Sequence, residues 1–215
     1  FSGLQILLIV SIHFSFFIMV SVSSFVCSFG SVAFSGSRRS GSSAAASCRA
    51  FLPVLGGFSG SVAVGCASGV DSLVRSAFPS ASVFSVSSFP VGGRVARASF
   101  ARRSAALVQS CAASGGLLVA FPLGACPAAV RPSASFSGCG SGSWGSVALA
   151  VGLGCSVLVV VPSGSSPVVA HHFPAPPALA SCFRCVGVAP CGGVLWLASP
   201  VPCAAPSVGA QLALF

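Results

Sequence analysis

Between residues 30 and 162 the chain alternates between short, continuous apolar runs and longer stretches of small residues. The apolar runs are rich in β-branched residues or Phe, as in strands that are buried on both faces of a sheet. The small-residue stretches are long enough to form helices. The pattern therefore predicts a three-layer α/β domain over residues 30–162, with a parallel sheet between helices. The expected strands are 31–34, 61–64, 82–86, 117–121 and 156–161, and the expected helices are 44–55, 70–77, 95–113 and 143–152.

The two ends of the chain have different patterns. Residues 1–29 form an apolar extension, in which the run 4–22 is close to the roughly 20 residues that span a bilayer. We expect it to be either a transmembrane segment or an untranslated lead-in. The protein is then cytoplasmic or, alternatively, membrane-anchored with its domain in the cytoplasm, because Arg38 and Arg39 follow the run. Residues 163–215 are Pro-rich, carry Arg184 as their single charge and show no period, which predicts a low-complexity tail.

The composition restricts the chemistry of the protein. Charged residues make up 5% of the chain, against roughly 25% in an ordinary soluble domain, and Asp71 is the single acid. This excludes mechanisms that need two carboxylates, such as glycosidase pairs and EF-hands. Most of the rare residue types have adenine-containing codons, so an adenine-poor coding strand explains both the composition and the high isoelectric point. That bias leaves open a decayed or spurious reading frame with no function.

The eleven cysteines are an odd number and about 5% of the chain, below the roughly 8 to 10% of a disulfide scaffold. We expect most of them to be reduced and buried. Cys182 and Cys185 have the two-residue gap of zinc ribbons, with Cys191, His171 and His172 nearby. No second pair has ribbon spacing, so no metal site is expected.

Three glycine-rich segments, 34–41, 64–71 and 137–145, follow the carboxyl ends of expected strands or open an expected helix. In a parallel sheet these ends share the edge where ligands bind. The first segment contains Arg38, whose guanidinium can bind a phosphate or carboxylate. The second carries Asp71 into a helix, and the third opens a helix whose free N–H groups suit an anion.

These segments, in this order, resemble the SLOG superfamily of Rossmann-like proteins, which includes DNA-processing protein A and the LOG nucleotide-processing proteins. The resemblance covers about residues 30–162 and rests on GSR at 36–38, GCASGVD at 65–71, LLVAFP at 117–122 and GSGSW at 140–144. It implies a nucleotide or nucleotide-derived ligand across the strand ends. We expect no cofactor. The residues that would bind this ligand are Gly36, Ser37, Arg38, Gly65, Asp71, Gly140, Ser141, Gly142 and Ser143.

The same resemblance does not extend to a reaction. LOG proteins hydrolyse nucleoside monophosphates with an Arg and a Glu in a PGGxGTxxE motif. The equivalent stretch here, 140–150, contains no Glu, and Ser143 stands where the family has Thr. We therefore assign no catalytic residue and no enzyme class.

A second hypothesis is single-stranded nucleic-acid binding, as in the DNA-processing branch. It rests on a cluster of arginines that would follow a phosphate backbone: Arg94, Arg97, Arg102 and Arg103. Trp144 is the best candidate for stacking on a base. Alternatively, these arginines are the solvated face of a helix. A cysteine nucleophile, Cys66, has the weakest support, because all three histidines lie outside the expected domain.

Overall fold

A computed structural model describes residues 22–137, 139–162, 173–189 and 193–199. Apart from Val22, the apolar run at 4–22 lies outside these residues, so the anchor prediction stays a prediction. Within the described ranges, no helix combines the length and apolar character needed to cross a membrane.

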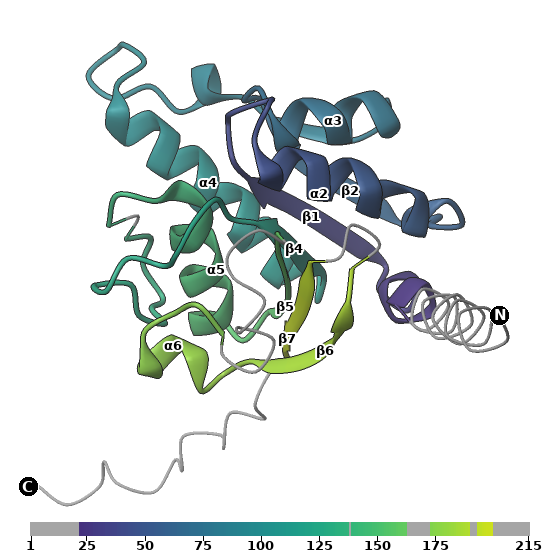
Figure 1. Cartoon of the computed structure of the whole chain (residues 1–215). Coiled ribbons are helices and arrows are strands. Elements are labelled where there is room, and N and C mark those ends of the chain that lie inside the picture. Colours follow the sequence, from purple (N-terminus) through teal and green to yellow (C-terminus); the bar gives the residue numbers. More distant parts are fainter. Residues whose placement is uncertain (1–21, 138, 163–172, 190–192, 200–215) are drawn as a thin grey trace, which may run out of the picture.

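One mixed seven-stranded sheet forms the centre of the protein, with strand order β3-β2-β1-β4-β5-β7-β6 (Figure 1). The first five strands in this order are parallel, and β7 is antiparallel to both β5 and β6. The strands are β1 (Ser31–Gly36), β2 (Ser61–Gly65), β3 (Ser82–Phe84), β4 (Leu117–Phe121), β5 (Ser156–Val161), β6 (Arg184–Val188) and β7 (Val194–Ala198).

Helices cover both faces of this sheet (Figure 1). One face packs against α2 (Ser43–Phe51), the 3-10 helix η1 (Leu52–Leu55) and α3 (Val70–Ala77). The other packs against α4 (Arg97–Ala113), α5 (Gly142–Gly152) and α6 (Pro177–Ala180). A second 3-10 turn, η2 (Val86–Ser88), lies between β3 and α4.

Alternation along the strands divides the core into two halves. In β1, Phe34 faces the α2 and α3 side, whereas Ala33 faces the α4 and α5 side. In β4, Leu117 and Val119 lie on the first side and Leu118 on the second. Every residue of β4 is buried, as expected for a central strand with helices on both faces. The predicted α/β class with helices on both faces of the sheet is therefore confirmed, but the sheet is mostly and not wholly parallel, because β7 is antiparallel to its neighbours.

Several element boundaries differ from the sequence prediction, and two of the differences have a local cause. The expected helix 44–55 is α-helical only to Phe51 and continues as η1, which has Pro53 at its start. Proline has no N–H to donate to the preceding turn, so it ends the α-helical hydrogen bonding. The expected strand 82–86 ends at Phe84, because Val86 already begins η2.

The described part of segment 163–215 is not the tail that its composition predicts. It supplies α6, β6 and β7, and β7 pairs along the whole of Val157–Val161. Phe173, Leu179 and Trp196 are buried in the same half of the core as α4 and α5. The domain therefore extends beyond residue 162.

The domain also begins before residue 30. Residues 22–27 are helical, and Val22 and Val26 are buried in the α2 and α3 half of the core. The Ser23 hydroxyl donates a hydrogen bond to the Val54 carbonyl oxygen over 2.8 Å. This helix therefore belongs to the packed domain.

Candidate functional site

The strand order reverses between β1 and β4: the chain leaves β1 toward one helical layer and leaves β4 toward the other. Such a switch point, at the carboxyl ends of the strands, is where open α/β sheets bind ligands. A cavity of about 450 Å³ lies there. Its lining comes from three loops and from the first turns of α4 and α5: Ser35, Gly36, Ser37, Arg38, Ala67, Asp71, Arg97, Phe100, Ala101, Arg103, Ser104, Leu123, Phe136, Gly140, Ser141, Gly142 and Ser143.

Backbone hydrogen bonds fix the loop after β1. The Ser37 N–H donates to the Phe121 carbonyl oxygen at 3.2 Å, and the Val70 N–H donates to the Ser37 carbonyl oxygen at 3.0 Å. Gly69 has φ +71, and a Cβ there would overlap the Ser37 carbonyl oxygen. The first two glycine-rich segments are thus packed directly against each other.

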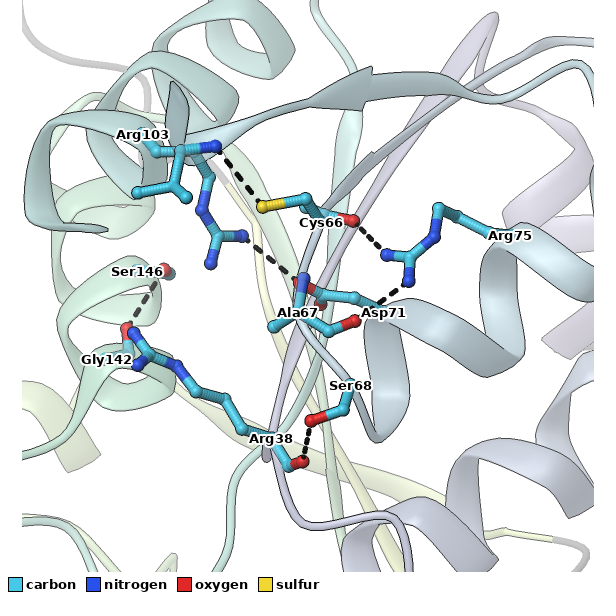
Figure 2. Close-up of polar contacts among 11 residues, drawn as sticks. Arg38, Cys66, Ala67, Ser68, Asp71, Arg75, Arg103, Gly142 and Ser146 are labelled. Carbon is cyan, nitrogen blue, oxygen red and sulfur yellow. Dashed lines mark hydrogen bonds and ion pairs between the residues drawn. The ribbon is translucent and has the colours of Figure 1, made fainter. Parts of the chain in front are cut away.

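Two arginines approach the loop after β2 from opposite sides (Figure 2). Arg75 donates to the carbonyl oxygens of Gly65, at 2.6 Å, and Ala67, at 3.0 Å. From the other side, Arg103 Nη1 lies 3.2 Å from Asp71 Oδ2, forming an ion pair. Asp71 Oδ2 also accepts the Ala67 N–H at 3.1 Å. The only acid of the chain therefore closes its own loop and holds an arginine of α4.

This ion pair is buried: Asp71 is 4% and Arg103 5% exposed. Removal from water raises the pKa of Asp71 above its usual value of 3.8, although Arg103 and the Ala67 N–H act in the opposite direction. Removing one partner of such a pair leaves an uncompensated buried charge. The folded protein therefore requires both Asp71 and Arg103, because each compensates the buried charge of the other.

Gly65, at the end of β2, makes room for this pair. A Cβ at this position would overlap Arg103 Nη1 and Asp71 Oδ2. Gly65 does not line the cavity, unlike every other residue that the resemblance assigns to the ligand. Its role is indirect: because Gly65 has no side chain, Arg103 can reach Asp71.

Arg103 retains unused hydrogen-bonding capacity. Its Nε is buried and has no hydrogen-bond partner among the residues that the structure describes. Nε and the neighbouring Nη2 form an edge that binds a carboxylate or phosphate through two parallel hydrogen bonds. Figure 2 shows a terminal nitrogen of this guanidinium turned away from Asp71. Arg103 also lines the cavity, so its guanidinium adds positive charge there.

The N-terminus of α5 forms another wall of the cavity. Ser141 is the N-cap, and its hydroxyl accepts the Trp144 N–H at 3.4 Å. Gly140, just before the cap, has φ +91, which glycine adopts without strain. Gly142 and Ser143 are the first two helical residues and also line the cavity. This helix terminus directs partial positive charge toward the space that Arg38, Arg97 and Arg103 surround.

Apolar side chains complete the lining. Phe100 of α4, Leu123 after β4 and Phe136 before α5 line the cavity, and the Arg38 guanidinium lies 4.4 Å from the centre of the Phe100 ring. None of the three apolar residues was predicted, because single aromatic and aliphatic residues in an apolar-rich chain carry no signal. The site therefore combines cationic groups with faces that suit a flat, weakly polar ring.

The predicted arginine cluster is divided by the structure. Arg94, Arg97 and Arg102 are exposed, whereas Arg103 is buried against Asp71. Only Arg97 and Arg103 line the cavity. The sequence did contain a signal for this difference, because Ser99, Arg103, Leu107 and Cys111 recur every fourth residue and form the buried face of α4.

The prediction that Trp144 stacks on a nucleic-acid base is wrong. Its side chain is fully buried, packs edge-on against Phe173 and donates its Nε1–H to the Gly124 carbonyl oxygen at 3.2 Å. The apolar run that follows it in α5 is also buried, so Trp144 belongs to the core. Among the described residues, the aromatic side chains that line the cavity are Phe100 and Phe136.

The cysteine predictions have mixed outcomes. Cys66 is half-buried outside the cavity lining, and its Sγ accepts the Val86 N–H at 3.2 Å. All cysteines in the described ranges are free thiols, but Cys27, Cys139 and Cys185 are exposed, so burial is less general than expected. Three of the zinc candidates, His171, His172 and Cys191, lie outside the described residues. The part of the chain that the structure describes contains no group of three metal-binding side chains.

Comparison with known proteins gives no relative. No protein-family model, no curated protein and no solved structure matches the chain. The geometry of the cavity and the sequence motifs that line it are therefore the observations that bear on function.

Proposed function

We propose that the protein binds a nucleotide or nucleotide-derived ligand in the cavity at the carboxyl edge of its sheet. The observation that carries this proposal is the convergence of three loops and three arginines on one space of about 450 Å³. That volume is within the roughly 300 to 1,000 Å³ of small-molecule sites. The resemblance of the lining motifs to SLOG proteins supports the same ligand class.

The charge of the lining favours an anionic ligand. Arg38, Arg97 and Arg103 face one acid, Asp71, which is already paired with Arg103. Phosphate groups would be bound by the Arg97 and Arg103 guanidinium groups and by the N-terminus of α5. Phe100 and Phe136 would contact the base. Because no further carboxylate or histidine lines the cavity among the described residues, the proposal covers binding and includes no reaction.

Isothermal titration of the full chain with nucleoside monophosphates and diphosphates, free nucleosides and inorganic phosphate tests this proposal. The key variant is Arg97→Ala, because Arg97 is exposed and lines the cavity. The matched control is Arg102→Ala, which removes an exposed arginine of the same helix outside the cavity. One lost charge-assisted hydrogen bond costs about 1.5 to 3 kcal/mol, so Arg97→Ala should weaken nucleotide binding roughly 10-fold to 100-fold. Arg102→Ala should leave the affinity unchanged.

A second function, single-stranded nucleic-acid binding, is favoured by the exposure of Arg94, Arg97 and Arg102. These arginines would contact successive phosphates, so Arg97→Ala and Arg102→Ala should then weaken binding of an oligonucleotide equally. The affinity should also fall steeply with salt, by about 0.7 units of logarithmic slope for each phosphate contact of a single strand. A nucleotide held in one cavity depends much less on salt. Equal losses with a steep slope would replace the first proposal, and no binding to any probe would reject both.

A further inference from the structure

Cys111 and Cys155 form a buried pair of thiols at the amino end of the sheet, away from the cavity. Their sulfur atoms lie 3.8 Å apart, although the two residues are 44 positions apart in the chain. Cys111 is 4% and Cys155 5% exposed. Cys111 belongs to the last turns of α4, and Cys155 comes directly before β5. The pair therefore connects a helix of one outer layer to the central sheet.

The surrounding backbone holds both thiols in place. Cys155 Sγ lies 3.2 Å from the Gly116 carbonyl oxygen and 3.4 Å from that of Ser156. A Cβ on Gly116 would come within 3.1 Å of Cys111 Sγ. The same Cβ would overlap the Ser31 hydroxyl oxygen, so the absence of a side chain on Gly116 makes room for Ser31 first and for Cys111 second.

We propose that Cys111 and Cys155 are an oxidation site, at which hydrogen peroxide converts the two thiols into a disulfide that ties α4 to the start of β5. One thiolate attacks a peroxide oxygen, breaks the O–O bond and becomes a sulfenic acid, while the leaving hydroxide takes a proton to form water. The second thiol attacks this sulfur, forms the S–S bond, and its proton leaves with the hydroxyl group as a second water. The thiols lose two electrons, and the peroxide gains them.

The geometry requires a small movement. A disulfide has an S–S length near 2.05 Å, so the sulfur atoms must approach by about 1.8 Å. Cys111 lies in the last turn of α4, which ends at Ala113, so a shift of this turn displaces no further helical residues, and the Gly116 N–H, which donates to the Cys111 carbonyl oxygen at 2.9 Å, must move with it. The hydrogen bond between the thiols lowers the pKa of Cys155 and raises that of Cys111.

The test treats the full reduced chain with peroxide, blocks the remaining thiols in denaturant with N-ethylmaleimide and digests it with chymotrypsin. Cuts after Leu107, Leu117, Leu153 and Leu158 place each cysteine of the pair in its own peptide. We expect a cross-linked peptide that contains Cys111 and Cys155 and is 2 Da lighter than its two reduced parts together. Peroxide should also raise the unfolding midpoint of the protein, because a disulfide constrains the unfolded chain.

Three variants identify the source of these effects. Cys111→Ala and Cys155→Ala should each abolish the cross-linked peptide and the rise of the midpoint. The matched control is Cys48→Ala, which removes a fully buried thiol from the other half of the core and should retain both. If maleimide labels Cys111 and Cys155 after peroxide treatment, or if each is linked to another cysteine, the proposal is overturned. Labelling of the unmutated chain decides this even where a variant fails to fold.

Discussion

Asp71 is an unusual residue because it is both the only acid of the chain and almost completely buried. Burial favours its neutral form, whereas Arg103 and the Ala67 N–H favour the carboxylate. Burial is the larger effect, so the pKa of Asp71 is raised above 3.8 in the folded protein. The folded state therefore holds a proton at pH values where the unfolded chain has already released it.

This pKa shift predicts how stability depends on pH. The free energy of unfolding should fall as pH rises from about 4 through the folded pKa of Asp71, with a slope of at most about 1.4 kcal/mol per pH unit. No other acidic side chain contributes to this window. Asp71→Asn should remove the slope, as urea unfolding at a series of pH values would show. A free energy that instead increases with pH would mean that Arg103, and not burial, controls the carboxyl group.

Gly65 provides a second prediction at the residue scale. Gly65→Ala places a methyl group where Arg103 Nη1 and Asp71 Oδ2 now lie, and overpacking of this kind costs about 1 to 3 kcal/mol. Urea unfolding should show that loss, together with weaker nucleotide binding as Arg103 is displaced. Gly57→Ala is the control, since nothing lies within 4 Å of its Cβ position. Equal stability of the two variants would contradict the role given to Gly65.

Among the secondary-structure elements, α5 has two roles: its length packs in the core, and its first turn lines the cavity. Only the start of the helix is therefore available to a ligand. Ser141 belongs to both roles, because its hydroxyl caps the helix and lies at the cavity wall.

Comparison with α2 separates the effect of the Ser141 cap on stability from its effect on ligand binding. Ser141→Ala and Ser42→Ala each remove an N-cap hydroxyl, from the Trp144 N–H and the Ala45 N–H respectively. Each should lower the free energy of unfolding by about 1 kcal/mol. Only Ser141→Ala should also weaken binding of the phosphorylated probes, because Ser42 is outside the cavity lining. Titration of both variants measures this, and equal affinities would remove α5 from the proposed site.

At the scale of the whole molecule, the C-terminal hairpin is part of the fold. β7 covers the outer edge of β5, and Phe173, Leu179 and Trp196 are buried with α4 and α5. Burial of one large apolar side chain contributes about 1.5 to 3 kcal/mol, and a domain is stable by only about 5 to 15 kcal/mol. The hairpin segment thus contributes an amount comparable with the total stability.

A chain that ends at Pro162 should therefore aggregate or lose cooperative unfolding. A chain that ends at Ser199 keeps β6 and β7 and is the control. Size-exclusion chromatography and thermal unfolding followed by circular dichroism compare the two. Cooperative unfolding at the same temperature in both would show that the hairpin is dispensable.

The sequence predicted the elements between β1 and β5 because each is marked by a strong local pattern. Leu117–Phe121 and Ser156–Val161 are continuous apolar strands, and Val70–Ala77 has the expected helical bounds. The hairpin was missed because Gly187 interrupts β6, and because β7 is a short apolar run in a Pro-rich segment. Its structure comes from pairing with β5, which is a tertiary contact without a local signal.

The site was predicted to a similar extent. Glycines and charged residues indicate where loops approach a ligand, so most of the predicted residues line the cavity. The burial of Arg103, the position of Gly65 behind it and the apolar wall of Phe100, Leu123 and Phe136 depend on how α4 packs over the loops. Packing between elements distant in the chain is not encoded in any one motif.

The antiparallel pairing of β5 with β7 also sets an order of events during synthesis. β5 is one of the most apolar strands, and its outer edge stays open until the ribosome has made β7, whose first residue, Val194, is 33 residues beyond Val161. At 5 to 20 residues per second this takes about two to seven seconds. During that interval the unpaired N–H and C=O groups of a Val-rich strand are available to other nascent chains. Yield in cells should therefore depend on translation speed between β5 and β7 and on chaperones that bind open strand edges.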